Sequence, residues 1–287
     1  MIAQLVVSGL AMAGPYVLFS IAFSLVLKTT GVWNFSQGGV MSLSVYAVYF
    51  ALNALGWPPV LAVAAGLFVA VAVSLAIERF GFEVLRRRNV GSLMLFVFSL
   101  VLSAFASDLL TLIFGTGSVT IYPSILSPVH LVDGVAVTNA NIESAVWSAA
   151  LAAAVLAGLK WLPAGQALVA VSKNRELAEL YGLSRRRAYL TAAAVSGVLV
   201  AVGMYLLALG VEVDPSIGSD LLVVAVAATI IGSIGNVTGT VIGAVLIALL
   251  QNFSVLVLPS VWQTAVVYGV LFAVIIFLPR GLLASAR

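Results

Sequence analysis

Residues 59–78 read PVLAVAAGLFVAVAVSLAIE, and four arginines follow them at positions 79, 86, 87 and 88. An apolar run of about 20 residues is long enough for one helix to cross the hydrocarbon core of a bilayer. Arginines that follow such a run within a few residues are typical of its cytoplasmic end. This stretch therefore predicts a membrane-spanning helix and the direction in which the chain crosses.

Apolar stretches of this kind recur along the whole chain. The others are residues 4–27, 38–56, 91–114, 142–162, 187–211, 220–233, 239–258 and 262–279. Of the 287 residues, 63% are hydrophobic and 8% are charged, whereas a soluble domain has about 45–50% apolar and about 25% charged residues. The composition predicts an all-α polytopic membrane protein. It excludes a nucleic-acid-binding protein, a soluble enzyme and a disordered chain, and the absence of cysteine excludes a disulfide scaffold.

The positions of the charges predict one orientation for all of these spans. The thirteen basic residues are Lys28, Arg79, Arg86, Arg87, Arg88, Lys160, Lys173, Arg175, Arg185, Arg186, Arg187, Arg280 and Arg287. The connections 57–58, 115–141, 212–219 and 259–261 contain none of them, although three acidic residues lie there, Asp133, Glu212 and Asp214. Short cytoplasmic loops retain Lys and Arg. We therefore expect the N-terminus outside the cell and the C-terminus in the cytoplasm.

Residues 220–258 are expected to form two passes. A single long helix would place the last two arginines outside, so the Gly-rich stretch 232–239 (GSIGNVTG) is predicted to turn at the cytoplasmic face. The pass before it has about 14 residues and a length of about 21 Å, which is shorter than the ~30 Å hydrocarbon core. We expect eight full transmembrane helices and one short or re-entrant helix, in a single transmembrane domain of residues 1–287.

A second Gly-rich interruption, GVWNFSQGG at residues 31–39, separates the first two apolar stretches. Interrupted hydrophobic segments in both halves of a transporter indicate its solute path. The amides Asn34 and Gln37 are three residues apart and would share one side of a helix. In the alternative interpretation, this is an ordinary cytoplasmic turn in which Asn34 caps the next helix and Gln37 points to water. The sequence leaves both interpretations open.

The link 163–186 between two spans contains a short predicted helix at residues 174–181. Asn174 or Ser172 is the expected N-cap, and Gly182 the C-terminal end. A helix of two turns is not stable alone, so it must dock on another surface. That surface is either the lipid headgroups or a cytoplasmic partner protein.

Two faces of this short helix have different chemistry. Leu177, Leu180 and Tyr181 fall on one apolar face. Arg175 and Glu179 have the i,i+4 spacing of an ion pair on another face. The apolar face is the one that we expect to contact a partner.

Three segments resemble signatures of one transporter family. Residues 34–38, NFSQG, resemble Asn-Phe-Ala-His-Gly. Residues 169–183, VAVSKNRELAELYGL, resemble Arg-Ala-x-x-x-Asn/Asp-x-x-x-Ala-x-x-x-Gly-Ile, and residues 232–243, GSIGNVTGTVIG, resemble Gly-x-Gly-Ser-x-x-Gly-Ala-x-x-Gly. Residues 214–218 and 278–282 resemble further family features. The chain is similar to the permease subunits of ABC importers for branched-chain (hydrophobic) amino acids, and in particular to the H-type subunit.

The resemblance implies a bacterial inner-membrane, multi-pass permease whose partners are a second homologous permease, two cytoplasmic ATPases and an extracytoplasmic solute-binding protein. It implies that the link 163–186 is the coupling loop and that its helix contacts the ATPase. The residues of that contact would be Asn174, Arg175, Glu176, Leu177, Leu180, Tyr181 and Gly182. Gln37 and Val169 depart from the family pattern, which has His and Arg there. Similar importers carry urea, short amides and other small organic solutes, which leaves such a solute as the alternative.

The chain carries no residues for catalysis, and we expect it to bind no metal or cofactor and no nucleic acid. It lacks the Gly-x-x-x-x-Gly-Lys-Ser/Thr sequence that holds ATP phosphates, and its one histidine, His130, lies in a loop. Two carboxylates lie near spans: Asp108, about two turns from the end of its span, and Asp220, which we expect to cap the short helix. Because ion-coupled transporters need intramembrane ionisable groups, partner ATPases are the expected energy source. A stand-alone secondary transporter or channel and an integral-membrane enzyme are the alternative classes.

Two further sets of residues are predicted from their spacing. Gly232, Gly235, Gly239 and Gly243 would share one helical face, where small residues allow close helix packing. Solute selectivity is predicted for Asn34, Gln37, Asn236 and Thr238. Amides and hydroxyls in an apolar path suit a small neutral or zwitterionic solute.

Overall fold

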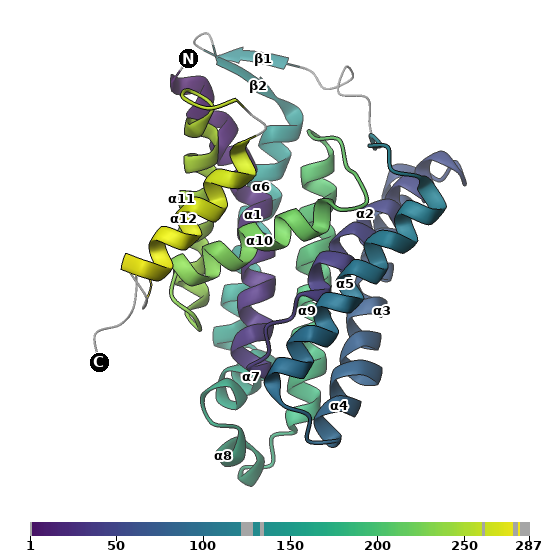
Figure 1. Ribbon diagram of the computed structural model, residues 1–287, viewed down its shortest axis with the longest axis vertical. Helices are drawn as coiled ribbons and strands as arrows, with labels where there is room; N and C mark the ends of the chain where they lie inside the picture. Colours follow the sequence, from purple (N-terminus) through teal and green to yellow (C-terminus); the bar gives the residue numbers. More distant parts are fainter. Residues whose placement is uncertain (1, 122–128, 133–134, 260–261, 278–280, 282–287) are drawn as a thin grey trace.

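The computed structural model describes residues 2–121, 129–132, 135–259, 262–277 and 281. It is built from helices with one small β-hairpin (Figure 1). The apolar helices are α1 (Ile2–Thr30), α2 (Ser36–Asn53), α3 (Pro59–Ala76), α5 (Ser92–Phe114), α6 (Asn139–Trp161), α9 (Arg185–Ala208), α10 (Ile217–Ile231), α11 (Val237–Ser254) and α12 (Gln263–Phe277). Each predicted apolar stretch corresponds to one of these helices. Asp133, Arg280 and Arg287 and most of residues 278–282 lie outside the described residues.

The remaining elements form the connections. The π-helical turn η1 (Ile77–Phe82) and α4 (Glu83–Arg87) continue α3. The strands β1 (Val129–Val132) and β2 (Val135–Thr138) pair in antiparallel register, with Val129 opposite Thr138. The link between α6 and α9 contains two helices, α7 (Pro163–Lys173) and α8 (Arg175–Leu180). Only the second of these was predicted, because Pro163 starts α7 as its first residue and does not merely end α6.

The helices confirm a polytopic membrane protein. Six of those described are long and apolar enough to cross a bilayer: α1, α3 with its continuation, α5, α6, α9 and α11. Helices α10 and α12 are apolar but have 15 residues each. A short α10 was predicted, whereas a full span was expected for α12. Helix α2 has 18 residues, but serines, tyrosines and Gln37 lower its hydropathy, so the count of eight full spans stays a prediction.

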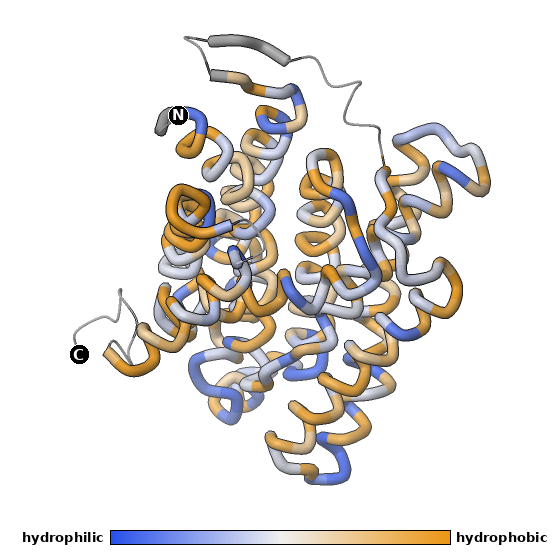
Figure 2. Tube along the Cα trace, turned by 45° about the horizontal axis from the view of Figure 1, so that its top comes forward, coloured by the Kyte–Doolittle hydropathy of each residue, from blue (hydrophilic) through white to orange (hydrophobic). Residues whose placement is uncertain are grey.

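Helix α1 lies at the centre of the molecule. In its most apolar segment 83% of the residues are buried, and it packs against α6, α9, α10 and α11. The corresponding buried share is 17% for α3 and for α6, so these helices present most of their surface to the surroundings. Figure 2 shows hydrophobic residues along most of each helix and hydrophilic residues concentrated in the connections. The outer helices thus have the apolar exposed surface that a lipid-facing helix requires.

The two groups of connections separate to opposite ends. The N-terminus and the β-hairpin lie at one end, and α7 and α8 at the other (Figure 1). Gln4 Nε2 donates to the carbonyl of Ala136 at 2.9 Å, which ties α1 to the hairpin. Val119 pairs with Val213 as an isolated bridge. These contacts join described parts of connections 115–141 and 212–219, neither of which has a basic residue, to one another and to the start of α1. Which end faces the cytoplasm stays a prediction.

Helices α10 and α11 form a tight antiparallel hairpin, as the two-pass interpretation of residues 220–258 requires. A Cβ atom on Gly239 would overlap the carbonyl oxygen of Gly232, and one on Gly243 would overlap that of Ala228. Gly235 has a φ of +88° and lies in the turn. The prediction that four glycines share one helical face is wrong, because α11 begins only at Val237. The close packing arises between two helices.

Candidate functional site

The interruption between α1 and α2 is a partly buried, non-helical segment. Gly31, with a φ of +68°, ends α1, and the chain resumes a helix at Ser36. Asn34 Oδ1 accepts a hydrogen bond from the backbone N–H of Ser36 at 3.1 Å, in a turn directly before α2. The N–H of Phe35 donates to Ser99 Oγ of α5 at 3.0 Å. These contacts satisfy backbone groups that would otherwise be costly to bury at membrane depth. Asn34 is therefore not the N-cap that the alternative interpretation expected, because Phe35 holds that position.

Gln37 lies inside the protein and does not point to water. Its side chain is 3% exposed. Its Nε2 donates to Ser196 Oγ of α9 at 2.8 Å and to the carbonyl of Ala22 of α1 at 3.4 Å. Its Oε1 has no hydrogen-bond partner. A buried amide oxygen without a partner costs free energy, so this atom is a candidate contact for a solute.

Asn34 and Gln37 line one polar pocket. Ser74, Glu78, Tyr189 and Ser196 complete its polar side. The pocket holds about 10 Å³, which is room for about one water molecule. The pocket is therefore narrow in this conformation. Asn236 and Thr238 do not reach it: Asn236 caps α11 through the N–H of Gly239 at 3.1 Å, and both residues line a different groove.

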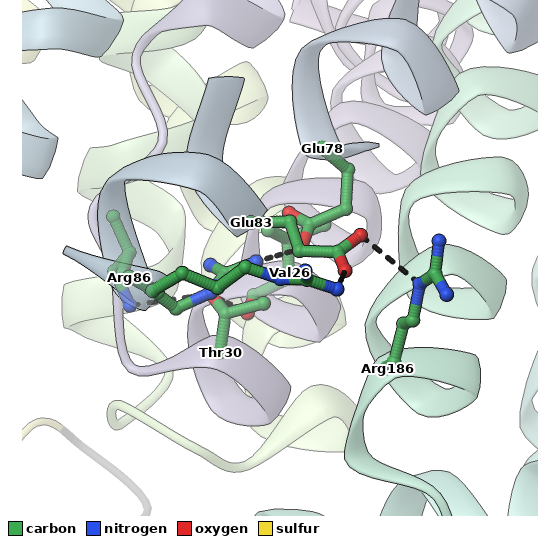
Figure 3. Close-up of polar contacts among 8 residues, drawn as sticks. Val26, Thr30, Glu78, Glu83, Arg86 and Arg186 are labelled. Carbon is green, nitrogen blue, oxygen red and sulfur yellow. Dashed lines mark hydrogen bonds and ion pairs between the residues drawn. The ribbon is translucent and has the colours of Figure 1, made fainter. Parts of the chain in front are cut away.

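Glu78 belongs to this pocket, although the sequence analysis did not select it. It is buried in the π-helical turn η1 and forms an ion pair with Arg86 (Figure 3). The Arg86 guanidinium lies 4.6 Å from the centre of the Tyr189 ring. Short π-helical segments inside helices occur often at functional sites. The sequence feature that could have indicated this ion pair is an acidic residue, Glu78, at the end of an apolar run, with Arg86 eight positions later.

A chain of ion pairs continues from this pocket toward α8. Glu83 binds Arg186 of α9 at 3.1 Å and Arg87 at 2.6 Å, and Figure 3 shows Glu83 reaching Arg186. Arg185, next to Arg186, binds Glu179 of α8 at 2.7 Å. The predicted pair of Arg175 with Glu179 is therefore wrong, because Glu179 turns to α9. The Nη2 atom of Arg175 instead lies beside Gly31, so close that a Cβ atom added to Gly31 would overlap it.

Helix α8 presents its apolar face to the surroundings. Asn174 Oδ1 accepts from the N–H of Leu177 at 3.0 Å, which confirms it as the N-cap. Gly182, with a φ of +81°, ends the helix as predicted. Ala178 is buried against the protein, whereas Leu180 is 85% exposed and its neighbours Leu177 and Tyr181 are also exposed. An exposed cluster of large apolar side chains on a short helix marks a contact surface.

Asp108 and Asp220 do not belong to a cluster of metal-ligating side chains among the described residues. Asp108 lies exposed on α5, and Asp220 is exposed in the first turn of α10. Asp220 lies in the first turn of α10, where a carboxylate is favoured, but the N-cap position is held by Ser216. Within the described part of the chain, no group of three or more metal-ligating side chains is found.

Comparison with known proteins agrees with this arrangement. Residues 5–278 match the family described as "Branched-chain amino acid transport system / permease component". The chain belongs to this family. The permease is 24% identical to the high-affinity branched-chain amino acid transport system permease protein LivH of Escherichia coli (strain K12), over 98% of this chain and 94% of the relative. No solved structure is significantly similar to it.

Other relatives of the permease vary in solute and in coverage. It is 26% identical to the BraD protein of Pseudomonas aeruginosa, a high-affinity branched-chain amino acid transport system permease, over 98% of this chain and 95% of the relative. It is 37% identical to the xylose transport system permease protein XylH of Haemophilus influenzae, but over 37% of this chain and 31% of that one. The full-length similarity is thus to permeases named for branched-chain amino acids.

Proposed function

We propose that this permease moves small neutral or zwitterionic solutes into the cytoplasm, and that these are branched-chain or other hydrophobic amino acids. The observation that carries the proposal is the match to LivH and BraD over 98% of the chain. The pocket of Asn34 and Gln37 offers amide donors and acceptors that suit the two ends of a zwitterion. Urea or a short amide is the second candidate, because Gln37 stands where the family signature has His.

We further propose that ATP hydrolysis by partner subunits drives transport through α8. Its exposed apolar face would enter a groove of the ATPase. Three separate ion pairs, Glu179–Arg185, Arg186–Glu83 and Arg86–Glu78, line one groove, and Glu78 also lines the pocket that contains Gln37. A second permease subunit and an extracytoplasmic binding protein would complete the importer in the bacterial inner membrane. A stand-alone transporter would need none of these partners.

Uptake of labelled leucine into liposomes tests the proposal. We expect uptake when the permease is reconstituted with its partner permease, the two ATPases, the binding protein and internal ATP, and none without the ATPases. Gln37→Leu should lower uptake about tenfold, since a lost hydrogen bond is worth about 0.5–1.5 kcal/mol. Competition by unlabelled urea, acetamide and xylose identifies the alternative solutes.

Gln251→Leu is the matched control for Gln37→Leu. Gln251 of α11 is also a buried glutamine whose Oε1 has no partner, but it lies outside the pocket. At equal amounts of folded protein we expect its uptake to stay near wild type. Equal losses in both variants would remove Gln37 from the solute path, and leucine uptake that persists without ATPases would establish a stand-alone transporter.

The proposed orientation predicts different labelling of two exposed serines. Ser216 directly precedes α10, in the connection after α9. Ser184 directly precedes α9, in the connection that contains α8. Because the chain has no cysteine, Ser216→Cys and Ser184→Cys can be read without background. A membrane-impermeant maleimide should label Ser216→Cys in intact cells, and Ser184→Cys only after permeabilisation. The reverse pattern would place the N-terminus in the cytoplasm.

A further inference from the structure

A groove of about 770 Å³ lies between α1, α6, α7 and the start of α11. It is lined by Lys28, Lys160 and Lys173, which come from three different helices. These are the three lysines of the whole chain. The fold therefore brings every lysine to one place, which the alternation of charge along the sequence does not require.

The three lysines lack the partners that the arginines have. Each ion pair found among the described residues joins an arginine to a glutamate, at Arg86, Arg87, Arg185 and Arg186. The groove lining contains no acidic side chain, and the charge of Lys173 repels that of Lys28. Like charges held together without a counter-charge are unfavourable. The groove thus has the electrostatics of an anion site.

Apart from Gln166, Asn236 and Thr238, the rest of the groove lining is apolar. Leu156 and Leu159 of α6 and Val169 of α7 line it together with Val237 of α11. Asn236 and Thr238 add an amide and a hydroxyl at its rim. A free inorganic anion needs no apolar walls, whereas a lipid has both a charged phosphate and acyl chains. The combination of cations and hydrocarbon favours a lipid.

An exposed tryptophan beside the groove indicates that the groove lies near the membrane surface. The Lys160 ammonium lies 5.8 Å from the ring centre of Trp161, which is 71% exposed. Tryptophan concentrates at the interface between headgroups and hydrocarbon. Helix α6, which ends at Trp161, has its apolar surface largely exposed along its length. An acyl chain could extend along this surface while the phosphate reaches the lysines.

We propose that this groove binds the phosphate of an anionic phospholipid, with Lys28, Lys160 and Lys173 as its ligands. Asn236 and Thr238, which do not reach the Gln37 pocket, lie at the rim beside the headgroup. Basic pockets between transmembrane helices are a recurrent site for such headgroups. Since Lys173 directly precedes Asn174, the N-cap of α8, the lipid also holds the start of α8 against α1 and α6.

Protection of the lysines from acetylation tests the site directly. The permease, purified with its partner subunits in a neutral detergent, is mixed with phosphatidylglycerol or with phosphatidylcholine and treated with an amine-reactive reagent. Mass spectrometry then measures modification at each lysine. We expect phosphatidylglycerol to slow modification of all three at least tenfold and phosphatidylcholine to leave it unchanged. Equal rates with both lipids would overturn the proposal.

Two further experiments distinguish a bound lipid phosphate from free phosphate and from a protein contact. Sodium phosphate at the same concentration should not protect, and equal protection by it would replace the lipid by a free anion. Protection that needs the ATPase subunits and no lipid would assign the groove to a protein contact. Both outcomes overturn the lipid assignment, and both leave the proposed transport function untouched.

Charge-matched variants provide a second readout. In native mass spectrometry, the triple variant Lys28→Gln, Lys160→Gln, Lys173→Gln should bind phosphatidylglycerol about a hundredfold more weakly, as expected for three basic contacts. The control replaces Arg79, Arg88 and Arg187 by Gln. These three arginines are exposed, form no ion pair among the described residues and lie outside the groove. Equal loss in both variants would show a nonspecific effect of net charge and overturn the site.

Discussion

We expect Leu180→Asp to abolish the proposed ATP-driven uptake and the stimulation of ATP hydrolysis by solute. Leu180 is 85% exposed on α8, so a charge there costs the fold of the permease little. In an ATPase groove, by contrast, each large apolar side chain contributes about 1.5–3 kcal/mol, and a buried unpaired carboxylate adds a further penalty. Docking should therefore weaken at least a hundredfold. Leu177→Asp should act in the same direction, because Leu177 is on the same face.

Arg187→Gln is the control for this prediction. Arg187 is exposed near the start of α9 and is not among the residues of the predicted ATPase contact. We expect this variant to transport normally and to retain the ATPase during affinity purification. Normal uptake by Leu180→Asp would contradict the coupling proposal and place α8 on the lipid headgroups.

We expect Gly239→Ala to prevent the α10–α11 hairpin from closing. The added Cβ atom would overlap the carbonyl oxygen of Gly232, which is a backbone atom that no side-chain rotation can move away. Overpacking of a core typically costs about 1–3 kcal/mol, and a clash between two backbones should exceed this range. We expect the melting temperature in detergent to fall by about 10 °C or more, or folded protein to be absent.

Gly269→Ala is the matched control on α12. Nothing lies within 4 Å of the position that its Cβ atom would take. Alanine is favoured over glycine inside a helix by about 0.5–1 kcal/mol, so the melting temperature should stay the same or rise slightly. If both variants melt at the wild-type temperature, the hairpin does not depend on backbone contact at Gly239.

Much of the fold can be predicted from the sequence, because membrane helices are specified by local properties. A run of apolar residues such as 59–78 must become a helix in lipid, since its backbone groups have no other partners there. The Asn174 cap and the Gly182 end of α8 were likewise predicted, because caps depend on residues a few positions apart. The separation of the connections into two ends follows from the alternation of charge.

The candidate site was predicted only in part. Asn34 and Gln37 were selected from the sequence, and they do line one pocket. Asn236 and Thr238 were selected by the same reasoning and lie elsewhere. Glu78 was missed, because its position depends on the π-helical turn that directs it into the protein. The predicted ion pair of Glu179 with Arg175 on the same helix does not form, because Glu179 pairs with Arg185 of α9 instead.

The sequence by itself determined which segments are helices, where they are interrupted and how the charges alternate, since these properties depend on neighbours along the chain. Only the tertiary structure decided which polar side chains meet. Gln37 contacts Ser196, which is 159 positions away, and the lysines at 28, 160 and 173 converge on one groove. Such pairings depend on how the helices pack against α1, and packing is set by the shapes of many side chains at once.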